Sequence, residues 1–159
     1  MIDWIGLSQR ASVAARDLVD QLRDIVRGRI IIDDRADAGL VEKEQRLVHG
    51  FAWAATTSEA LSAATGWAEP ARREEAYGDI ESLILRIGLG EYCAQLAGGI
   101  AMSQNEIMRL GEFDLEHAIA EFVSNDAVAP FLADGNTARA RRQSSHMLGD
   151  GIRPYEGLG

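Results

Sequence analysis

Apolar residues recur at helical spacing in the first part of the chain. Leu18, Leu22 and Ile25 follow an i, i+4, i+7 pattern, and arginine and aspartate occupy the opposite positions. This amphipathic stripe predicts a helix over about residues 8–29. The apolar run 30–32 follows, either as a short strand or as the helix's last apolar turn. Because a single strand has no partner here, we expect a packed extended connector.

A second apolar pattern predicts a helix over about residues 38–68, with Asp37 as its N-cap. Its buried side is marked by large residues and widened by many alanines, which favour close approach between helices. Leu40, Leu47, Phe51 and Leu61 are the large residues, and Ala54 marks the same side. Trp53 and Trp67 are large anchors that belong either in the core or at an interface. Gly66 and Pro70 are expected to end this helix.

The third predicted helix begins near Ala71 and continues to about Ala97, with room for a kink at Gly88 and Gly90. Its apolar face is formed by Ile80, Leu83, Ile84 and Ile87. Gly98-Gly99 is a stop signal. Ser103, with Glu106 three residues later, then matches a capping box and predicts a short helix that ends at Gly111.

Two further helices are predicted in the last third of the chain. Asp114 is placed to cap one that ends by Pro130, and Asn136 or Thr137 to cap another that ends near Leu148. The pattern as a whole predicts an all-α bundle of about five to six helices. We expect a helical domain over residues 1–113. Residues 114–159 supply further helices and a loose glycine-rich tail, packed on the same core.

Composition supports this class and narrows the function. The chain has 159 residues, of which 47% are hydrophobic and only 6% aromatic, and its net charge is −9. Such acidity argues against nucleic acid or an anionic membrane as a partner. The basic cluster Arg139, Arg141 and Arg142 is either a solvated helix face or a contact for phosphate or an acidic partner. No apolar run is long enough to span a membrane, and we expect a cytoplasmic protein.

The sequence offers little chemistry of its own. The single cysteine, Cys93, lies in an apolar run and is expected to be a buried thiol. Asp114 and His117 have a spacing that can share a metal, but no Glu-x-x-His pair accompanies them, so we expect no metal. His49 is expected to be a hydrogen-bonded core or interface residue. Nucleophile elbows and phosphate-binding loops are lacking, and an independent enzyme is the least favoured interpretation.

One stretch resembles a known family. It comprises Gly90-Glu91-Tyr92, Ala94-Gln95, Gly98-Gly99-Ile100, Met102-Ser103-Gln104, Glu106-Ile107 and Arg109, with Val41–Gln45 and His49–Trp53 upstream. These residues resemble the N-terminal helical extension of methylsuccinyl-CoA dehydrogenase-type enzymes. Those enzymes are FAD-dependent acyl-CoA dehydrogenases of the ethylmalonyl-CoA pathway. The resemblance implies a dehydrogenase-related module over residues 10–113. The excess of arginine over lysine, of which Lys43 is the only one, suggests a bacterial source.

Two weaker likenesses point the same way. Residues 98–110 are similar to the glycine-rich turn of the acyl-CoA dehydrogenase C-terminal helical domain, which lies near flavin and a subunit interface. This implies that Ser103, Gln104 and Arg109 are candidates for contacting nucleotide or a partner subunit. The segments 122–130 and 154–159 resemble the start of the catalytic region. The family's catalytic base and main flavin contacts have no matching positions here.

The sequence therefore predicts a non-catalytic helical module that holds no cofactor alone, whereas FAD would belong to the parent enzyme. Its expected partner is a second copy or a dehydrogenase catalytic chain, contacted through Trp53, Trp67 and Tyr92. Two alternatives stay open. One is an independent protein that binds a small acyl-type ligand between the second and third helices, in a cleft closed by residues 98–102. The other is a homodimeric bundle without a ligand.

Overall fold

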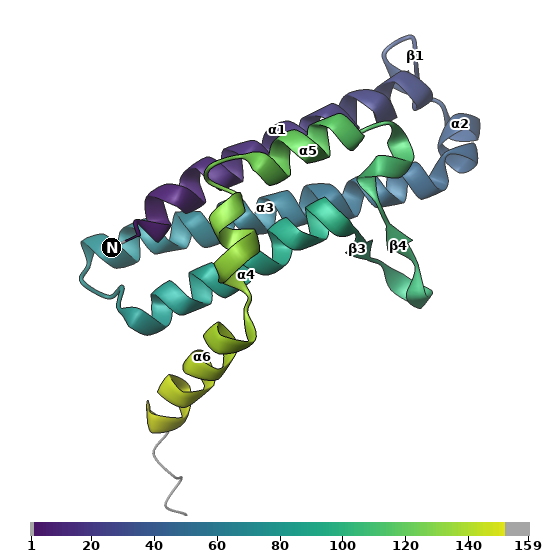
Figure 1. The fold of residues 1–159 in the computed structure, drawn as a ribbon. Coiled ribbons are helices and arrows are strands. Elements are labelled where there is room, and N and C mark those ends of the chain that lie inside the picture. Colours follow the sequence, from purple (N-terminus) through teal and green to yellow (C-terminus); the bar gives the residue numbers. More distant parts are fainter. Residues whose placement is uncertain (1, 152–159) are drawn as a thin grey trace, which may run out of the picture.

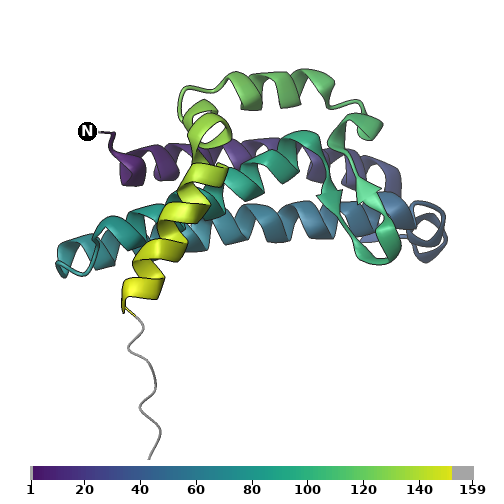
Figure 2. The same cartoon turned by 60° about the horizontal axis from the view of Figure 1, so that its bottom comes forward.

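The computed structural model describes residues 2–151 and has an all-α architecture, as the sequence predicts. Three long helices, α1 (Trp4–Ile30), α3 (Gln45–Arg73) and α4 (Asp79–Gly98), lie side by side and form the core (Figure 1). The shorter helices are α2 (Ala38–Lys43), α5 (Glu116–Ser124), which runs along α1, and α6 (Ala138–Gly151). Figure 2 shows α6 crossing the bundle and extending beyond it.

The connector after α1 is a hairpin, so the prediction of an unpaired extended segment was wrong. Strands β1 (Ile31–Ile32) and β2 (Arg35–Ala36) pair antiparallel. Asp33 and Asp34 make this tight turn because both adopt left-handed backbone angles, which aspartate tolerates. The predicted cap at Asp37 is confirmed: its carboxylate accepts a hydrogen bond from the Leu40 amide at 2.9 Å.

The α1–α3 contact has a polar centre. The hydroxyls of Ser12 on α1 and Thr65 on α3 are both buried, and their oxygens lie 3.0 Å apart. The pair satisfies two polar groups inside an otherwise apolar cluster, which avoids the cost of leaving them unbonded. Leu18, Leu22 and Leu61 are among the fully buried side chains around it.

Pro70 does not end α3, contrary to prediction. It lies in the last turn, where its missing amide removes a single helix bond. The turn stays helical because Ala68 is buried against the core and because the Gln9 amide on α1 donates to Glu69 at 2.8 Å. Since α3 ends at Arg73, the third long helix begins later than predicted, at Asp79 rather than near Ala71. The predicted single helix over residues 38–68 is also interrupted, at Glu44, between α2 and α3.

The capping-box helix predicted at Ser103 is wrong. Strands β3 (Ile100–Ala101) and β4 (Ile107–Met108) pair antiparallel there, joined by a 3₁₀ turn, η1 (Ser103–Asn105). The hairpin forms because its paired residues Ile100 and Met108 are both buried in the core, and Asn105 takes the left-handed conformation that reverses the chain. The helix stop is confirmed, since Gly99 ends α4 with φ +140°.

The last third of the chain is also less regular than predicted. After a 3₁₀ turn, η2 (Leu110–Phe113), Asp114 adopts a left-handed conformation instead of capping α5. Helix α5 ends at Ser124, well before Pro130, which leads into the single π-helical turn η3 (Phe131–Gly135). Thr137 caps α6 as predicted, because its hydroxyl accepts from the Ala140 amide at 3.1 Å. The predicted motif at residues 154–159 lies outside the described residues.

Helix α4 continues without interruption through Gly88 and Gly90. Its side at Gly90 packs against η3 so closely that the two backbones touch. A Cβ atom built on Gly90 would lie 2.6 Å from the Asn136 amide nitrogen and 2.9 Å from the Phe131 carbonyl oxygen. Gly90 is therefore needed for close approach between two backbones, rather than for a kink.

Candidate functional site

Trp53 and Trp67 lie on the outer face of α3 and not in the core, with 39% and 43% of their surfaces exposed. The Trp53 indole N–H donates to Nε2 of His49 at 3.0 Å, and the ring of Trp67 lies 6.4 Å from that of Tyr77. Tyr92, the third predicted interface residue, is half-buried on α4 and packs against the core. The two tryptophans are therefore better placed than Tyr92 to meet a partner.

The exposed face of α3 between the two tryptophans is nearly free of charge. We call Trp53, Thr56, Ala60, Ala63 and Trp67 the α3 seam. Their spacing of three and four residues places them along one side of the helix. Glu59 is the one charged residue between Trp53 and Trp67. An apolar helix face of this length is typical of a packing surface.

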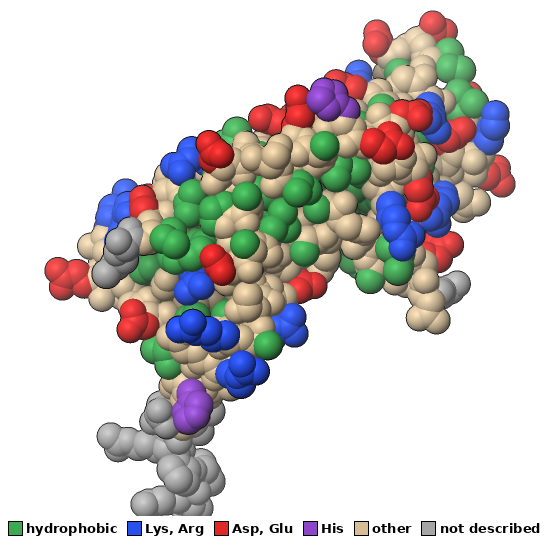
Figure 3. Space-filling view, in the orientation of Figure 1, with side chains coloured by type: hydrophobic (Ala, Val, Ile, Leu, Met, Phe, Trp, Pro, Cys, Tyr) green, Lys and Arg blue, Asp and Glu red, His purple; other side chains and the backbone are tan. Residues whose placement is uncertain are grey.

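Exposed apolar side chains also occur outside α3. Hydrophobic side chains gather along the middle of the face in Figure 3, and acidic and basic groups lie toward its edges. The exposed apolar residues of α4 and α5 include Ile84 and Val123, with 49% and 39% of their surfaces exposed. Substitutions at these positions can serve as controls for substitutions in the α3 seam.

The hairpin residues implied by the family resemblance lie in η1 and just after β4. Ser103 is exposed in the turn η1, whereas Arg109 follows β4 and lies 4.0 Å from Glu112. The side chain of Gln104 lies outside the described part of the chain. Among the described residues, no hydrogen bond or ion pair joins Ser103 to Arg109. Their role in binding nucleotide or a subunit stays a prediction.

Arg46 links β4 and η2 to the start of α3. Its guanidinium donates to the Ile107 carbonyl at 3.1 Å and to the Glu112 carboxylate at 2.9 Å, and it lies 3.8 Å from Glu106. The hydrogen bond and charge of Glu112 raise the pKa of Arg46. A basic residue on α3 thus holds β4 and η2 in place, a link that local sequence patterns do not reveal.

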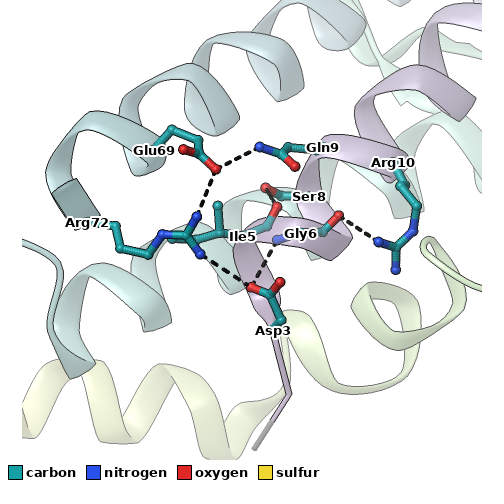
Figure 4. Close-up of polar contacts among 8 residues, drawn as sticks. All are labelled: Asp3, Ile5, Gly6, Ser8, Gln9, Arg10, Glu69 and Arg72. Atoms are coloured by element: carbon teal, nitrogen blue, oxygen red, sulfur yellow. Dashed lines mark hydrogen bonds and ion pairs between the residues drawn. The ribbon is translucent and has the colours of Figure 1, made fainter.

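A cleft of about 730 Å³ opens where the start of α1 meets the α3–α4 loop and α4. Figure 4 shows its polar edge: Asp3 accepts from the Gly6 amide and lies 3.9 Å from Arg72, which also bonds Glu69 at 3.1 Å. Gln9 of α1 donates to the same carboxylate of Glu69. These contacts tie the ends of α1 and α3 together along one side of the cleft.

Trp4 and Arg86 form another side of this cleft. The Arg86 guanidinium lies 4.4 Å from the centre of the Trp4 ring, a cation–π geometry, and donates to the Asp134 carbonyl at 3.3 Å. Its Nε and the Tyr77 hydroxyl are buried and have no hydrogen-bond partner among the described residues. Burial raises the pKa of Tyr77. Sequence patterns could not reveal this cleft, because its residues come from four separate parts of the chain.

Cys93 is fully buried on α4, as predicted, and burial raises the pKa of its thiol to about 12. A thiol that stays protonated is a poor nucleophile at neutral pH. Of the histidines, His117 lies 3.6 Å from Glu121 rather than pairing with Asp114. Within residues 2–151, no group of three metal-ligating side chains comes together.

The raised pKa of Cys93 makes stability depend on alkaline pH. The folded state keeps a proton that the unfolded chain releases, so this stability is complete below pH 9.0 and is lost as pH rises toward 12. We expect a loss of roughly 4 kcal/mol in the free energy of unfolding across that window. Urea titrations at several pH values measure it. The free energy of unfolding of Cys93→Ala should fall less steeply with rising pH than that of the wild type. The same pH dependence in both proteins would contradict Cys93 as the cause.

None of the helices within the described part of the chain combines the length and apolarity needed to cross a bilayer.

Comparison with known proteins identifies one relationship. No protein-family profile matches the chain. Over 148 residues it is 32% identical to a (2S)-methylsuccinyl-CoA dehydrogenase from Cereibacter sphaeroides. The match covers 93% of this chain and 26% of that enzyme, so the chain spans about a quarter of the relative's length. Nearly the whole chain is therefore similar to one segment of that methylsuccinyl-CoA dehydrogenase.

Proposed function

We propose that the chain is a non-catalytic helical module that associates with a FAD-dependent acyl-CoA dehydrogenase of the methylsuccinyl-CoA type. The observation that carries this proposal is the coverage of the match: nearly all of this chain corresponds to a small part of a much longer enzyme. Flavin binding and dehydrogenation then belong to the dehydrogenase, and this module acts through helix packing and oligomerisation.

The exposed tryptophans support packing as its mode of action. Tryptophan is enriched in the energetically important centres of protein interfaces, because it buries a large rigid surface. Trp53 and Trp67 present such surfaces from the rigid helix α3. The half-buried Tyr92 is a weaker candidate for the same role.

Co-purification tests the proposal. The chain, carrying an affinity tag, is co-expressed with any acyl-CoA dehydrogenase encoded beside it in its own genome, and the eluate is sized by light scattering. We expect the two proteins to elute as a stable complex. Flavin absorbance at about 450 nm should accompany the dehydrogenase. The module purified alone should be colourless. Bound flavin in the isolated module, or no complex with neighbouring dehydrogenases, would contradict the proposal.

A second candidate function is binding of a small ligand, which the cleft between α1 and α4 favours. Its volume of about 730 Å³ is within the range of small-molecule sites, and Trp4 and Ile5 give it apolar walls beside the polar Arg86 and Ser82. The cleft expected at residues 98–102 is a poorer candidate, because Ile100 and Met102 are buried in the core. Titration with short-chain acyl thioesters, followed by tryptophan fluorescence, tests it; an unchanged spectrum counts against it.

A further inference from the structure

We propose that the α3 seam is the contact surface for a second copy of this chain, packed antiparallel about a two-fold axis at Ala60. This inference rests on the proposed function in one respect, that helix packing is the chain's mode of action. It adds the partner, the surface and the register.

Two of the three polar side chains in the seam, Trp53 and Thr56, already make hydrogen bonds within α3. The Trp53 indole N–H bonds His49 at 3.0 Å, and the Thr56 hydroxyl donates to the Ala52 carbonyl at 2.8 Å. Covering these side chains with another apolar surface therefore leaves neither donor without a partner, which removes the usual cost of burying them. The remaining seam residues Ala60 and Ala63 are small and permit close approach of a second helix.

The two tryptophans of the seam, though not its other residues, exchange places when α3 is reversed about Ala60. Trp53 and Trp67 lie seven residues before and after Ala60, at heptad spacing. Positions seven residues apart drift by only about 20° around a helix, so this series stays on one side. Reversing α3 about Ala60 brings Trp53 of one copy onto Trp67 of the other, twice. In a two-fold interface each contact occurs twice in this way.

Charge complementarity at the ends of α3 fits the same register. Arg46 and Glu74 lie fourteen residues before and after Ala60, and both are exposed. An antiparallel pair places the guanidinium of Arg46 near the carboxylate of the other copy's Glu74, at both ends. Arg46 also bonds Glu112 within its own chain, but a guanidinium has five donors and can serve two carboxylates.

Two features oppose association and predict its salt dependence. Each copy carries a net charge of −9, and Glu59 is next to the two-fold axis. Salt screens these repulsions and also the two Arg46–Glu74 attractions. Because the repulsion between two copies of net charge −9 involves many more charges, we expect salt to strengthen the dimer. Glu59→Gln should strengthen it as well.

Sedimentation velocity of the full chain over a range of concentrations tests the proposal. We expect a monomer–dimer equilibrium that Trp53→Ser and Trp67→Ser each weaken by roughly tenfold or more. Val123→Ser on α5 is the matched control, because Val123 is as exposed as Trp53, at 39%, and lies outside the seam. A wild-type chain that stays monomeric, or a dimer that resists both tryptophan substitutions, would overturn the proposal.

Ala60→Cys tests the register. The two-fold axis places the new thiols opposite each other, so mild oxidation should link two copies covalently. Cys93 is buried and stays unreacted. Ala120→Cys, on the exposed side of α5, should give little cross-linking. A dimer that fails to cross-link through position 60 rejects this register.

The test for a complex with the dehydrogenase is independent of the test for the dimer. A monomer that binds the dehydrogenase through Trp53 and Trp67 would overturn the second copy as occupant and leave the proposed function standing. A dimer that binds no dehydrogenase would support the inference and contradict the proposed function.

Discussion

Alanine at Gly90 should destabilise the fold, whereas alanine at Gly88, two residues earlier on the same helix, should stabilise it. At Gly90 the added methyl group meets backbone atoms of residues 131–136 at 2.6–3.0 Å, and backbone cannot move aside as a side chain can. At Gly88 nothing lies within 4 Å of the added Cβ. We expect a loss of about 2–3 kcal/mol at Gly90 and a gain of up to about 1 kcal/mol at Gly88.

The two variants control for each other. Both replace glycine by alanine within α4, so both gain the same intrinsic helix propensity, and the difference between them isolates the contact with η3. Urea denaturation followed by far-ultraviolet circular dichroism gives both free energies. Changes of the same sign and similar size would show that α4 and η3 are not in backbone contact.

Phe131→Ala should cause a larger loss, about 3–5 kcal/mol. Phe131 is fully buried in η3, and its ring centre lies 5.2 Å from that of Trp4. Truncation leaves a cavity between the start of α1, α4 and η3. The closely packed Gly90 backbone prevents η3 from moving inward to fill it. The destabilisation is measured by the same urea titration.

A second readout locates the effect of this substitution. Trp4 should become more mobile when it loses the Phe131 ring, which changes its fluorescence in the folded state. Leu148→Ala on α6 is the control, because half of Leu148 is exposed and its truncation should cost less than about 0.5 kcal/mol. Similar losses for both variants would place Phe131 outside the core.

Sequence patterns predicted the elements that local chemistry determines. The amphipathic stripe of α1, the Asp37 cap, the Gly99 stop and the Thr137 cap each depend on residues within one or two turns. The β3–β4 hairpin was missed because its Ser-x-x-Glu signal is weaker than the burial of Ile100 and Met108 against distant helices. Tertiary packing overrode local propensity there.

The prediction for Pro70 failed for a related reason. A proline in the last turn removes only one helix bond, and contact with α1 compensates for it. The position of a proline within a helix therefore matters more than its presence.

The candidate sites also differ in whether local sequence could reveal them. Trp53 and Trp67 could be selected from sequence because large aromatic residues in an alanine-rich helix are conspicuous. Their exposure could not be predicted, since apolar residues occur around much of α3. The cleft at Trp4 and Arg86 could not be found at all, because only the folded chain brings residues 4, 77 and 86 together.

The position of α6 has a consequence for local stability. This helix packs mainly on α4 and extends away from the three-helix core (Figure 2). A segment with so few neighbours can unfold while the rest of the protein stays folded. Its amide hydrogens should therefore exchange with solvent deuterium much sooner than those of α1 and α3. Slower exchange in α6 when a second protein is present would reveal that this helix has become part of an interface.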